Sequence, residues 1–300
     1  WLIKNIINNM KIRTKLIISY LSIVIVTVLI VGVYLTSRMN NIVVENAIKE
    51  GRYNNNSIKS RMEEVLKLAI NTSDMIYQDD NLHSMLKREY DNYGQVVSAY
   101  NEYTILSDYL KYYNEFNKVD MYVDNDTLLN TTGIFKVTDE IRGSSWYNKA
   151  IDDKGIITWL YKRDETTGNY SLSLVRSINS TSRGNIGVLV ISISPNYLAN
   201  IVNDELYKTS ILVDGRVIYS NDLKVGEIAE LGGSEAEASY YYEINEEFNE
   251  NGDHLILNTF KLDKSFNNIF QVLVNVPVDI ITMESNTVIK KGILIIGIVI

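Results

Sequence analysis

Residues 16–35, LIISYLSIVIVTVLIVGVYL, form an uninterrupted run of twenty residues without a charged side chain. A helix rises about 1.5 Å per residue, so a run of this length spans the roughly 30 Å hydrocarbon core of a bilayer. The run predicts a transmembrane helix. The alternatives are a helix buried in a soluble domain and a cleaved signal peptide, whose apolar run would be shorter and would end in a small-residue cleavage site.

The charges on the two sides of this run differ. Residues 1–15 carry four basic residues and no acidic one, whereas Arg38 and Lys49 after the run are matched by Glu45 and Glu50. Basic residues concentrate on the cytoplasmic side of membrane helices. We therefore expect a cytoplasmic basic arm at 1–15 and an extracytoplasmic location from residue 36 onward.

The last nine residues, GILIIGIVI at 292–300, are also wholly apolar. Nine residues are too few to cross a bilayer as a helix. The interpretation is that residues 279–300 hold a connecting helix and the truncated start of a second transmembrane helix, in a fragment of a longer protein. Residues of about 36–288 would then lie outside a plasma membrane that the chain crosses more than once.

Composition limits the remaining body of the chain. Its formal net charge is −8, and because residues 1–15 contribute +4, the rest sums to −12. An acidic body argues against nucleic acid as a partner, since phosphate binding needs clustered Lys and Arg. Cysteine is absent, which excludes disulfides and cysteine metal sites. Hydrolase and P-loop motifs are missing, so we expect no catalytic residue, no cofactor and no metal.

A helical pattern occupies residues 36–78. Apolar residues recur in steps of three and four, which makes one stripe along a helix, interrupted by Gly51 and Asn55; they are Val44, Ile48, Ile58, Met62, Val65, Ala69 and Ile76. This stalk helix could pack on its own domain or form a dimer. Shorter helices are predicted at 79–91 and 95–115.

Strand patterns then replace the helical ones. The first group predicts strands at 118–124, 155–161, 169–178 and 185–194, closed by a helix at 194–206 that begins with Ser194 and Pro195. The second group predicts a hairpin at 210–220 around Asp214-Gly215 and strands at 238–245, 254–262 and 269–277. The sequence therefore predicts an α+β fold with two antiparallel-sheet modules in series, at 79–206 and 207–278.

The segment IRGSSWYNKA, at 141–150, predicts a short helix that starts at Ser144 or Ser145 and lies on the first sheet. Trp159 and Tyr161 share one face of a predicted strand, and Arg176 lies on the next strand. An aromatic lid above a sheet that bears one arginine suits a small polar ligand. The alternative is that Trp146 packs in the core and Arg176 makes a structural ion pair.

Five segments carry a resemblance to a known family: RMEEVLKLAINTSDMIYQDDNL, MYVDNDTLLN, KVTDEIRGSSWYNKA, YSLSLVRSI and GVLVISISPNYL. They resemble the sensor region of YesM-type histidine kinases, whose ectodomains are double Cache modules with two PAS-like sheets. The resemblance covers about 11–300 and is more specific in the first module. It implies a homodimer in the plasma membrane, with the kinase domains after residue 300 and a cytoplasmic response regulator as partner.

The resemblance also suggests where a ligand would bind. Amino-acid sensors of the wider double Cache group share an Arg-x-Trp-Tyr pattern and a later Asp. Here Ser144 stands at the Arg position and Ser192 near the Asp position, which disfavours an α-amino acid. The resemblance to YesM-type sensors implies instead a saccharide or a saccharide-loaded binding protein. The candidate ligand-binding residues are Tyr122, Asp139, Arg142, Trp146, Tyr147, Trp159, Tyr161, Tyr170, Arg176 and Ser192.

Two rival functions stay open. The same ectodomain could belong to a chemotaxis receptor or a cyclic-dinucleotide enzyme, or the chain could be a structural membrane protein that senses nothing.

Overall fold

The computed structural model describes residues 11–163, 168–180, 184–203, 205–229, 243–248, 252–263, 268–283, 286–287 and 291. The chain divides into two compact units. The first contains residues 1–50, 248–254 and 276–300, and the second contains residues 51–247 and 255–275. Helix α2 (Ile12–Tyr77) runs through both.

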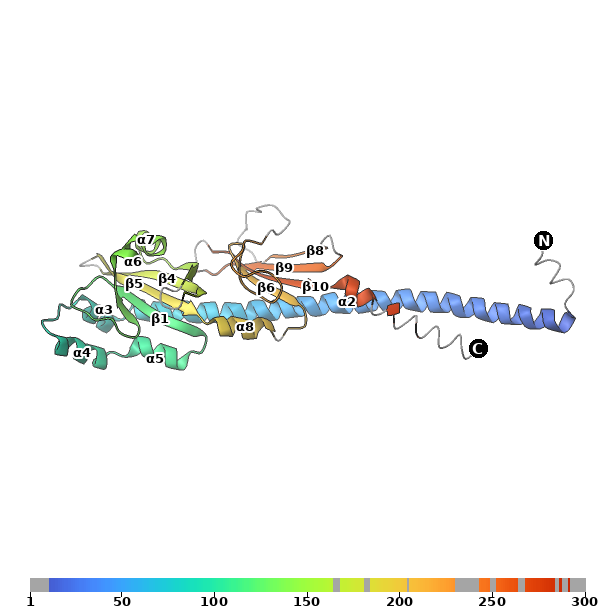
Figure 1. Cartoon of the computed structure of the whole chain (residues 1–300), viewed down its shortest axis with the longest axis horizontal. Coiled ribbons are helices and arrows are strands. Elements are labelled where there is room, and N and C mark those ends of the chain that lie inside the picture. The colour runs from blue at the N-terminus through green and yellow to red at the C-terminus, as the bar shows by residue number, and fades with distance from the viewer. Residues whose placement is uncertain are drawn as a thin grey trace. The chain divides into compact units, whose positions relative to one another are not determined.

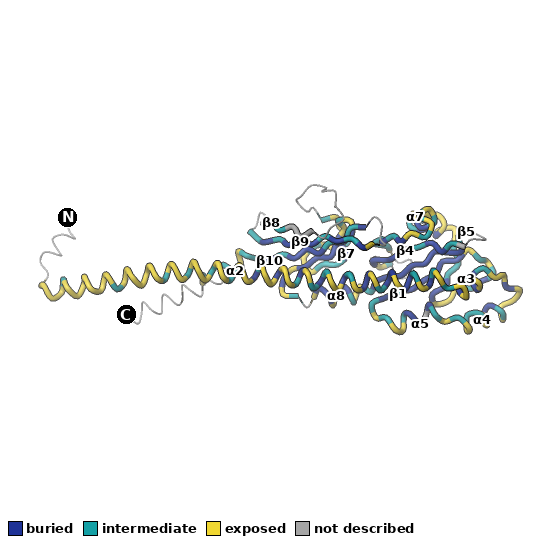
Figure 2. Tube along the Cα trace, turned by 180° about the vertical axis from the view of Figure 1, so that it is seen from behind, coloured by how far each residue is buried: buried dark blue, intermediate teal, exposed yellow. Residues whose placement is uncertain are grey.

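In the first unit, the N-terminal part of α2 is long and apolar enough to cross a membrane. Its most apolar 18 residues have a mean hydropathy of 2.8, and none of them is buried, as the yellow stretch of α2 in Figure 2 shows. A core helix of a soluble domain would bury this surface. In the same unit, Asn40 donates a hydrogen bond to the Asn286 side chain at 2.7 Å. The predicted second membrane helix at 292–300 lies outside the described residues.

The second unit holds two five-stranded sheets (Figure 1). The first has the order β2-β1-β5-β4-β3, and all its pairings are antiparallel except β1 with β2. Its strands are β1 (Phe116–Val123), β2 (Ile134–Lys136), β3 (Thr158–Arg163), β4 (Tyr170–Ser180) and β5 (Gly184–Ile193).

The second sheet has the order β7-β6-β10-β9-β8. Its strands are β6 (Lys208–Val213), β7 (Arg216–Ser220), β8 (Glu243–Phe248), β9 (His254–Phe260) and β10 (Phe270–Val276). The predicted hairpin is confirmed, because Asp214 and Gly215 both have positive φ angles, 51° and 74°. A two-residue turn of this kind matches the twist of the strands that it joins. Of the strand predicted at 238–245, only its last three residues lie in the described range, at the start of β8.

The described residues of the second unit also form six further helices. They are α3 (Asp80–Lys87), α4 (Tyr93–Glu102), α5 (Ile105–Tyr112), α6 (Asp139–Gly143), α7 (Ser145–Asp152) and α8 (Pro195–Asn203). Helices α6 and α7 lie over one face of the first sheet, as Figure 1 shows. Helix α2 contacts the opposite face, where Arg176 of β4 bonds to Asp74.

The prediction of a single helix at 95–115 is wrong, because the structure has two helices there. The chain leaves the helical conformation at Tyr103, with φ −127° and ψ 93°, and starts again at Ile105. The hydroxyl of Tyr103 donates to an Asp79 carboxylate oxygen at 2.6 Å. This long-range hydrogen bond holds the break in place, and no local pattern encodes it.

Gly51 and Asn55 interrupt the apolar stripe of the predicted stalk helix, but they do not interrupt the helix itself. Helix α2 continues through both residues, and the Asn55 side chain is 1 % exposed. Its amide nitrogen donates to the carbonyl oxygens of Ile256 at 2.8 Å and Val272 at 2.9 Å. Asn55 therefore fixes the register of α2 on strands β9 and β10, because a buried amide must keep its hydrogen bonds.

Candidate functional site

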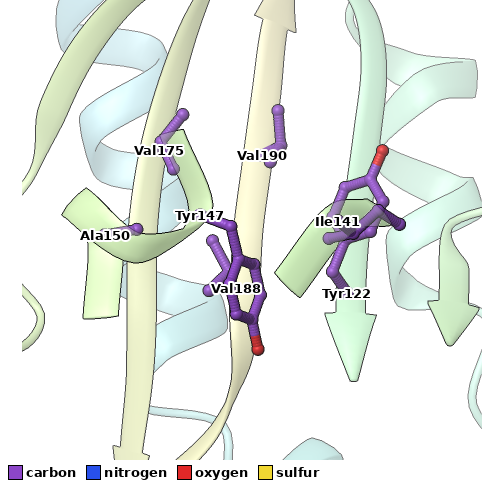
Figure 3. Packing of buried hydrophobic residues seen from close by; sticks show 7 residues of the cluster. All are labelled: Tyr122, Ile141, Tyr147, Ala150, Val175, Val188 and Val190. Atoms are coloured by element: carbon purple, nitrogen blue, oxygen red, sulfur yellow. The ribbon is translucent and has the colours of Figure 1, made fainter. Parts of the chain in front are cut away.

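The face of the first sheet beneath α6 and α7 is packed with side chains. Tyr147 of α7 is 4 % exposed and lies over Val188, in a cluster with Tyr122 and Val190, which Figure 3 shows from close by. Trp146 is half-buried at the margin of this cluster and meets the Tyr122 ring edge-on at 5.2 Å. The helix start at Ser145 is confirmed, but Tyr122 and Tyr147 are core residues and do not face an open space.

Trp159, Tyr161 and Arg176 lie on the opposite face of the sheet. The register pairs Trp159 with Leu174 and Tyr161 with Leu172, whereas Leu160 between them shares the face of Trp146. Side chains alternate along a strand. The prediction that Trp159 and Tyr161 face the same side of the sheet as the α7 aromatics is therefore wrong.

Arg176 makes a structural ion pair, which was the alternative to a role in ligand binding. Its Nη1 donates to Asp74 Oδ1 at 2.8 Å, its Nε donates to the Gly155 carbonyl at 2.8 Å, and its guanidinium lies 4.0 Å from the Tyr77 ring centroid. Both ends of the ion pair are mostly buried. Arg176 and Trp146 therefore cannot contact one small ligand.

Three other candidates also have structural partners or lie away from a cavity. The exposed Arg142 forms two 3.0 Å hydrogen bonds to Asp124, and these bonds hold the pKa of the Asp124 carboxyl below its ordinary value. Ser192 is buried and hydrogen-bonds to Ser173 at 2.9 Å. Asp139 is exposed in the first turn of α6.

A cavity of about 850 Å³ lies at the outer edge of β3, which is the edge strand of the first sheet. One side is formed by α6, α7 and β3, and the other by the β6–β7 turn. The cavity is lined by Glu140, Ser145, Trp146, Lys149, Trp159, Leu160, Tyr161, Lys162, Arg163, Gly168, Tyr170, Val213, Asp214 and Arg216. Of the candidates from the sequence, Trp146, Trp159, Tyr161 and Tyr170 are lining residues, and the other six are not.

The aromatic lining is held by ring contacts on both faces of β3. Tyr161 and Tyr170 stack with centroids 5.4 Å apart, and Lys162 lies 4.3 Å from the Trp146 ring centroid. Burial raises the pKa of the Tyr161 hydroxyl and Tyr170 raises it further, while Arg216 lowers it. The hydroxyl therefore stays neutral at physiological pH and can both donate and accept a hydrogen bond.

Asn268 fixes the edge of the cavity, and it was not among the candidate residues. Its Oδ1 accepts from the Trp159 backbone N–H at 2.8 Å, and its Nδ2 donates to the Trp159 carbonyl at 3.0 Å and to Asp214 at 2.7 Å. The amide thus takes the place of a neighbouring strand at the edge of β3. Trp159 also meets the Phe270 ring edge-on at 6.0 Å. A lone Asn between two predicted strands carries no pattern that distinguishes it from turn residues.

The side chains that line the cavity suit the binding of a ligand. Among the residues that the structure describes, no group of three or more His, Asp or Glu is placed to hold a metal ion. The described lining contains hydroxyl, amine, guanidinium, carboxylate and aromatic groups, without an imidazole. Such a cavity can orient a polar molecule by hydrogen bonds and ring contacts.

Comparison of the sequence with protein-family models and with curated proteins found no match. Solved structures with a similar arrangement include the ligand-binding domain of the Campylobacter jejuni chemoreceptor Tlp3 in complex with 4-methylisoleucine. It has 14% identity and a TM-score of 0.49, and the alignment covers 81% of this chain and 93% of that one. The Pseudomonas aeruginosa PAO1 amino acid chemoreceptor PctC, with GABA, has 13% identity, a TM-score of 0.48 and coverages of 79% and 99%.

A third similar structure is an extracellular domain described as that of a histidine kinase, rpHK1S-Z16. It has 12% identity and a TM-score of 0.49, with 80% of this chain and 95% of that chain covered. At these values, the likeness assigns neither a family nor a ligand to this chain.

Proposed function

We propose that this chain is the extracytoplasmic sensing region of a membrane receptor and that it binds a small polar ligand in the cavity beside β3. One observation carries the proposal: the cavity takes lining residues from both sheets of the second unit, Tyr161 of β3 on one side and Val213 of β6 and Arg216 of β7 on the other. A ligand that touches both sheets can favour one arrangement of them. It does so only through its different affinity for the two arrangements.

The membrane location rests on the N-terminal part of α2. The apolar run at 16–35 is exposed along its length, and basic residues precede it. A bilayer is the solvent that makes such a surface stable, and the basic arm places the N-terminus in the cytoplasm. Residues 36 onward are then outside the cell, where the cavity meets external solutes. A homodimer and a second membrane crossing are further parts of the proposal and rest on the sequence.

The proposed output is a histidine kinase that phosphorylates a response regulator. The resemblance of the sequence to YesM-type sensors supports this output, and the alternative is a chemotaxis receptor or a cyclic-dinucleotide enzyme. An autophosphorylation assay on the full-length receptor in vesicles distinguishes the kinase from these alternatives. Transfer of the γ-phosphate of ATP to a histidine supports the kinase, and its absence favours the alternative.

The binding test uses the full chain in nanodiscs and a thermal-shift screen of sugars, organic acids and amino acids. At least one class should raise the melting temperature, since a ligand that binds only the folded state stabilises it. Tyr170→Ala should weaken that binding, because Tyr170 lines the cavity and is 53 % exposed, so its removal leaves the core intact.

The matched control is Tyr112→Ala, which removes a 79 % exposed tyrosine of α5 outside the cavity. It should leave binding unchanged. Binding that survives both Tyr170→Ala and a cavity-filling Ser145→Trp variant would contradict the proposed site. A screen in which no compound binds would contradict the sensing function and favour a structural role.

A further inference from the structure

The lining of the cavity beside β3 is positively charged in a chain that is negatively charged overall. Among the described residues, it contains four cationic side chains, Lys149, Lys162, Arg163 and Arg216, and two acidic ones, Glu140 and Asp214. These six side chains sum to a net charge of +2, whereas the whole chain carries −8. Like charges gathered around one cavity repel one another, and a bound anion relieves this repulsion.

Asp214 accepts its hydrogen bonds from neutral N–H groups. Asp214 uses one carboxylate oxygen to accept from the Ile269 N–H at 2.8 Å and the other to accept from Asn268 at 2.7 Å. Within the described part of the chain, Lys149, Arg163 and Arg216 form no ion pair with a carboxylate. Arg163 and Arg216 donate to carbonyl oxygens, of Gly168 at 3.2 Å and of Gly226 at 2.5 Å, and these are neutral groups.

The cations approach the cavity from three elements. Lys149 lies on α7, Arg163 is the last residue of β3, and Arg216 is the first residue of β7. A guanidinium presents a planar fork of N–H groups that matches the two oxygens of a carboxylate. A volume of about 850 Å³ accommodates a molecule of the size of a monosaccharide or a small organic acid.

We propose that the ligand of this cavity carries a carboxylate, as a uronic acid or a small organic acid does. The inference rests on the proposed sensing function and names the ligand class for the same site. A neutral sugar gains no net electrostatic attraction from the cationic side chains of the lining. An α-amino acid gains less than a simple acid, because the cations of the lining repel its ammonium group.

The test is isothermal titration calorimetry on the full chain in phosphatidylcholine nanodiscs, whose lipids carry no net charge. The probes are galacturonate and galactose, which share a ring and differ in charge, with succinate as an acid without a ring and glutamine as a zwitterion. We expect an acid to bind, galactose to bind at least about tenfold more weakly than galacturonate, and the affinity of the acid to fall as salt is added.

The matched variants are Arg216→Gln and Lys149→Gln, each expected to weaken binding of the acid by about three- to tenfold. Both side chains are exposed, so the fold should survive. The control is Lys111→Gln on α5, a cation outside the cavity that pairs with Asp108 at 2.9 Å. It should leave the affinity unchanged.

The possible failures separate the two proposals. Binding of galactose as tight as that of galacturonate, with no effect of Arg216→Gln, overturns the carboxylate inference and leaves the sensing function standing. The same holds if glutamine binds more tightly than either acid. If neither acid binds, the carboxylate inference is overturned, and the sensing function falls only if the broader thermal-shift screen also finds no ligand.

Discussion

Replacement of Asn268 by alanine should destabilise the edge of the first sheet. The side chain is 6 % exposed and makes two hydrogen bonds to the backbone of Trp159, whose own exposure is 1 %. Alanine leaves a buried N–H and a buried carbonyl without these partners, and each orphaned group costs about 1–3 kcal/mol. The sum, with some relief from water at the cavity, is about 2–4 kcal/mol. For a domain of this size, that lowers the melting temperature by roughly 4–16 °C.

The assay is thermal unfolding of the full chain in detergent, followed by tryptophan fluorescence, to which Trp159 contributes. Asn148→Ala is the control, because Asn148 is an exposed asparagine of α7 and its loss should change the melting temperature by no more than about 1–2 °C. A melting temperature for Asn268→Ala equal to that of Asn148→Ala would refute the bridging role of the amide.

Asn268→Asp tests the geometry separately from size. Its second oxygen would face the Trp159 carbonyl and the Asp214 carboxylate, where the amide nitrogen now donates. This position raises the pKa of the new carboxyl. The hydrogen-bonding of its protonated form is therefore lost as the pH rises through that raised pKa. The variant should be closer to wild type in melting temperature at pH 5 than at pH 8, and the opposite trend would contradict the contacts.

Three further predictions follow from buried polar contacts. Arg176→Leu removes the cation beside Asp74 and should lower the free energy of unfolding in urea by about 2–4 kcal/mol. Ligand affinity should stay unchanged, because Arg176 faces α2. Loss of binding with an intact fold would disprove this placement. Asn55→Ala removes two buried hydrogen bonds and should cost about 2–3 kcal/mol, with faster hydrogen exchange in β9 and β10 as the check. Burial, and to a lesser extent Lys87, lower the pKa of His83 in the folded chain. As the pH falls, the unfolded chain therefore binds a proton at this histidine before the folded chain does, near pH 6.5. Stability should fall as the pH drops below about 6.5, and should fall less in His83→Gln when melting is compared at pH 7.5 and 5.5.

Local patterns predicted most elements of the fold. Period-two alternation identified the strands near 118–124 and 169–194, and Asp214-Gly215 identified the hairpin, because backbone conformation at these positions depends on the residues themselves. The break between α4 and α5 was missed, since the hydrogen bond from Tyr103 to Asp79 joins residues that are distant in sequence. The short helix α6 and the strand β2 were also missed, because elements of three to five residues are too short to show a periodic pattern of apolar residues.

The candidate site was predicted only in part. Trp146, Trp159, Tyr161 and Tyr170 do line the cavity, yet they reach it from both faces of an edge strand, which residue spacing cannot show. Whether a strand is at the edge of a sheet depends on pairing between distant segments. The cations Lys149 and Arg216 lie 67 positions apart in the sequence, and nothing local indicates that they line one cavity.

The sequence by itself determined the exposed apolar helix, the two sheet modules and the absence of hydrolase and P-loop motifs, since these follow from composition and period. Tertiary structure alone decided what the polar residues do. Arg176 looked like a ligand contact and Asn55 like a gap in an apolar stripe. Folding placed Arg176 against Asp74, and the Asn55 amide nitrogen against two backbone carbonyl oxygens. A buried polar group must find a partner wherever the fold supplies one, and that partner is fixed by the packing of the whole domain.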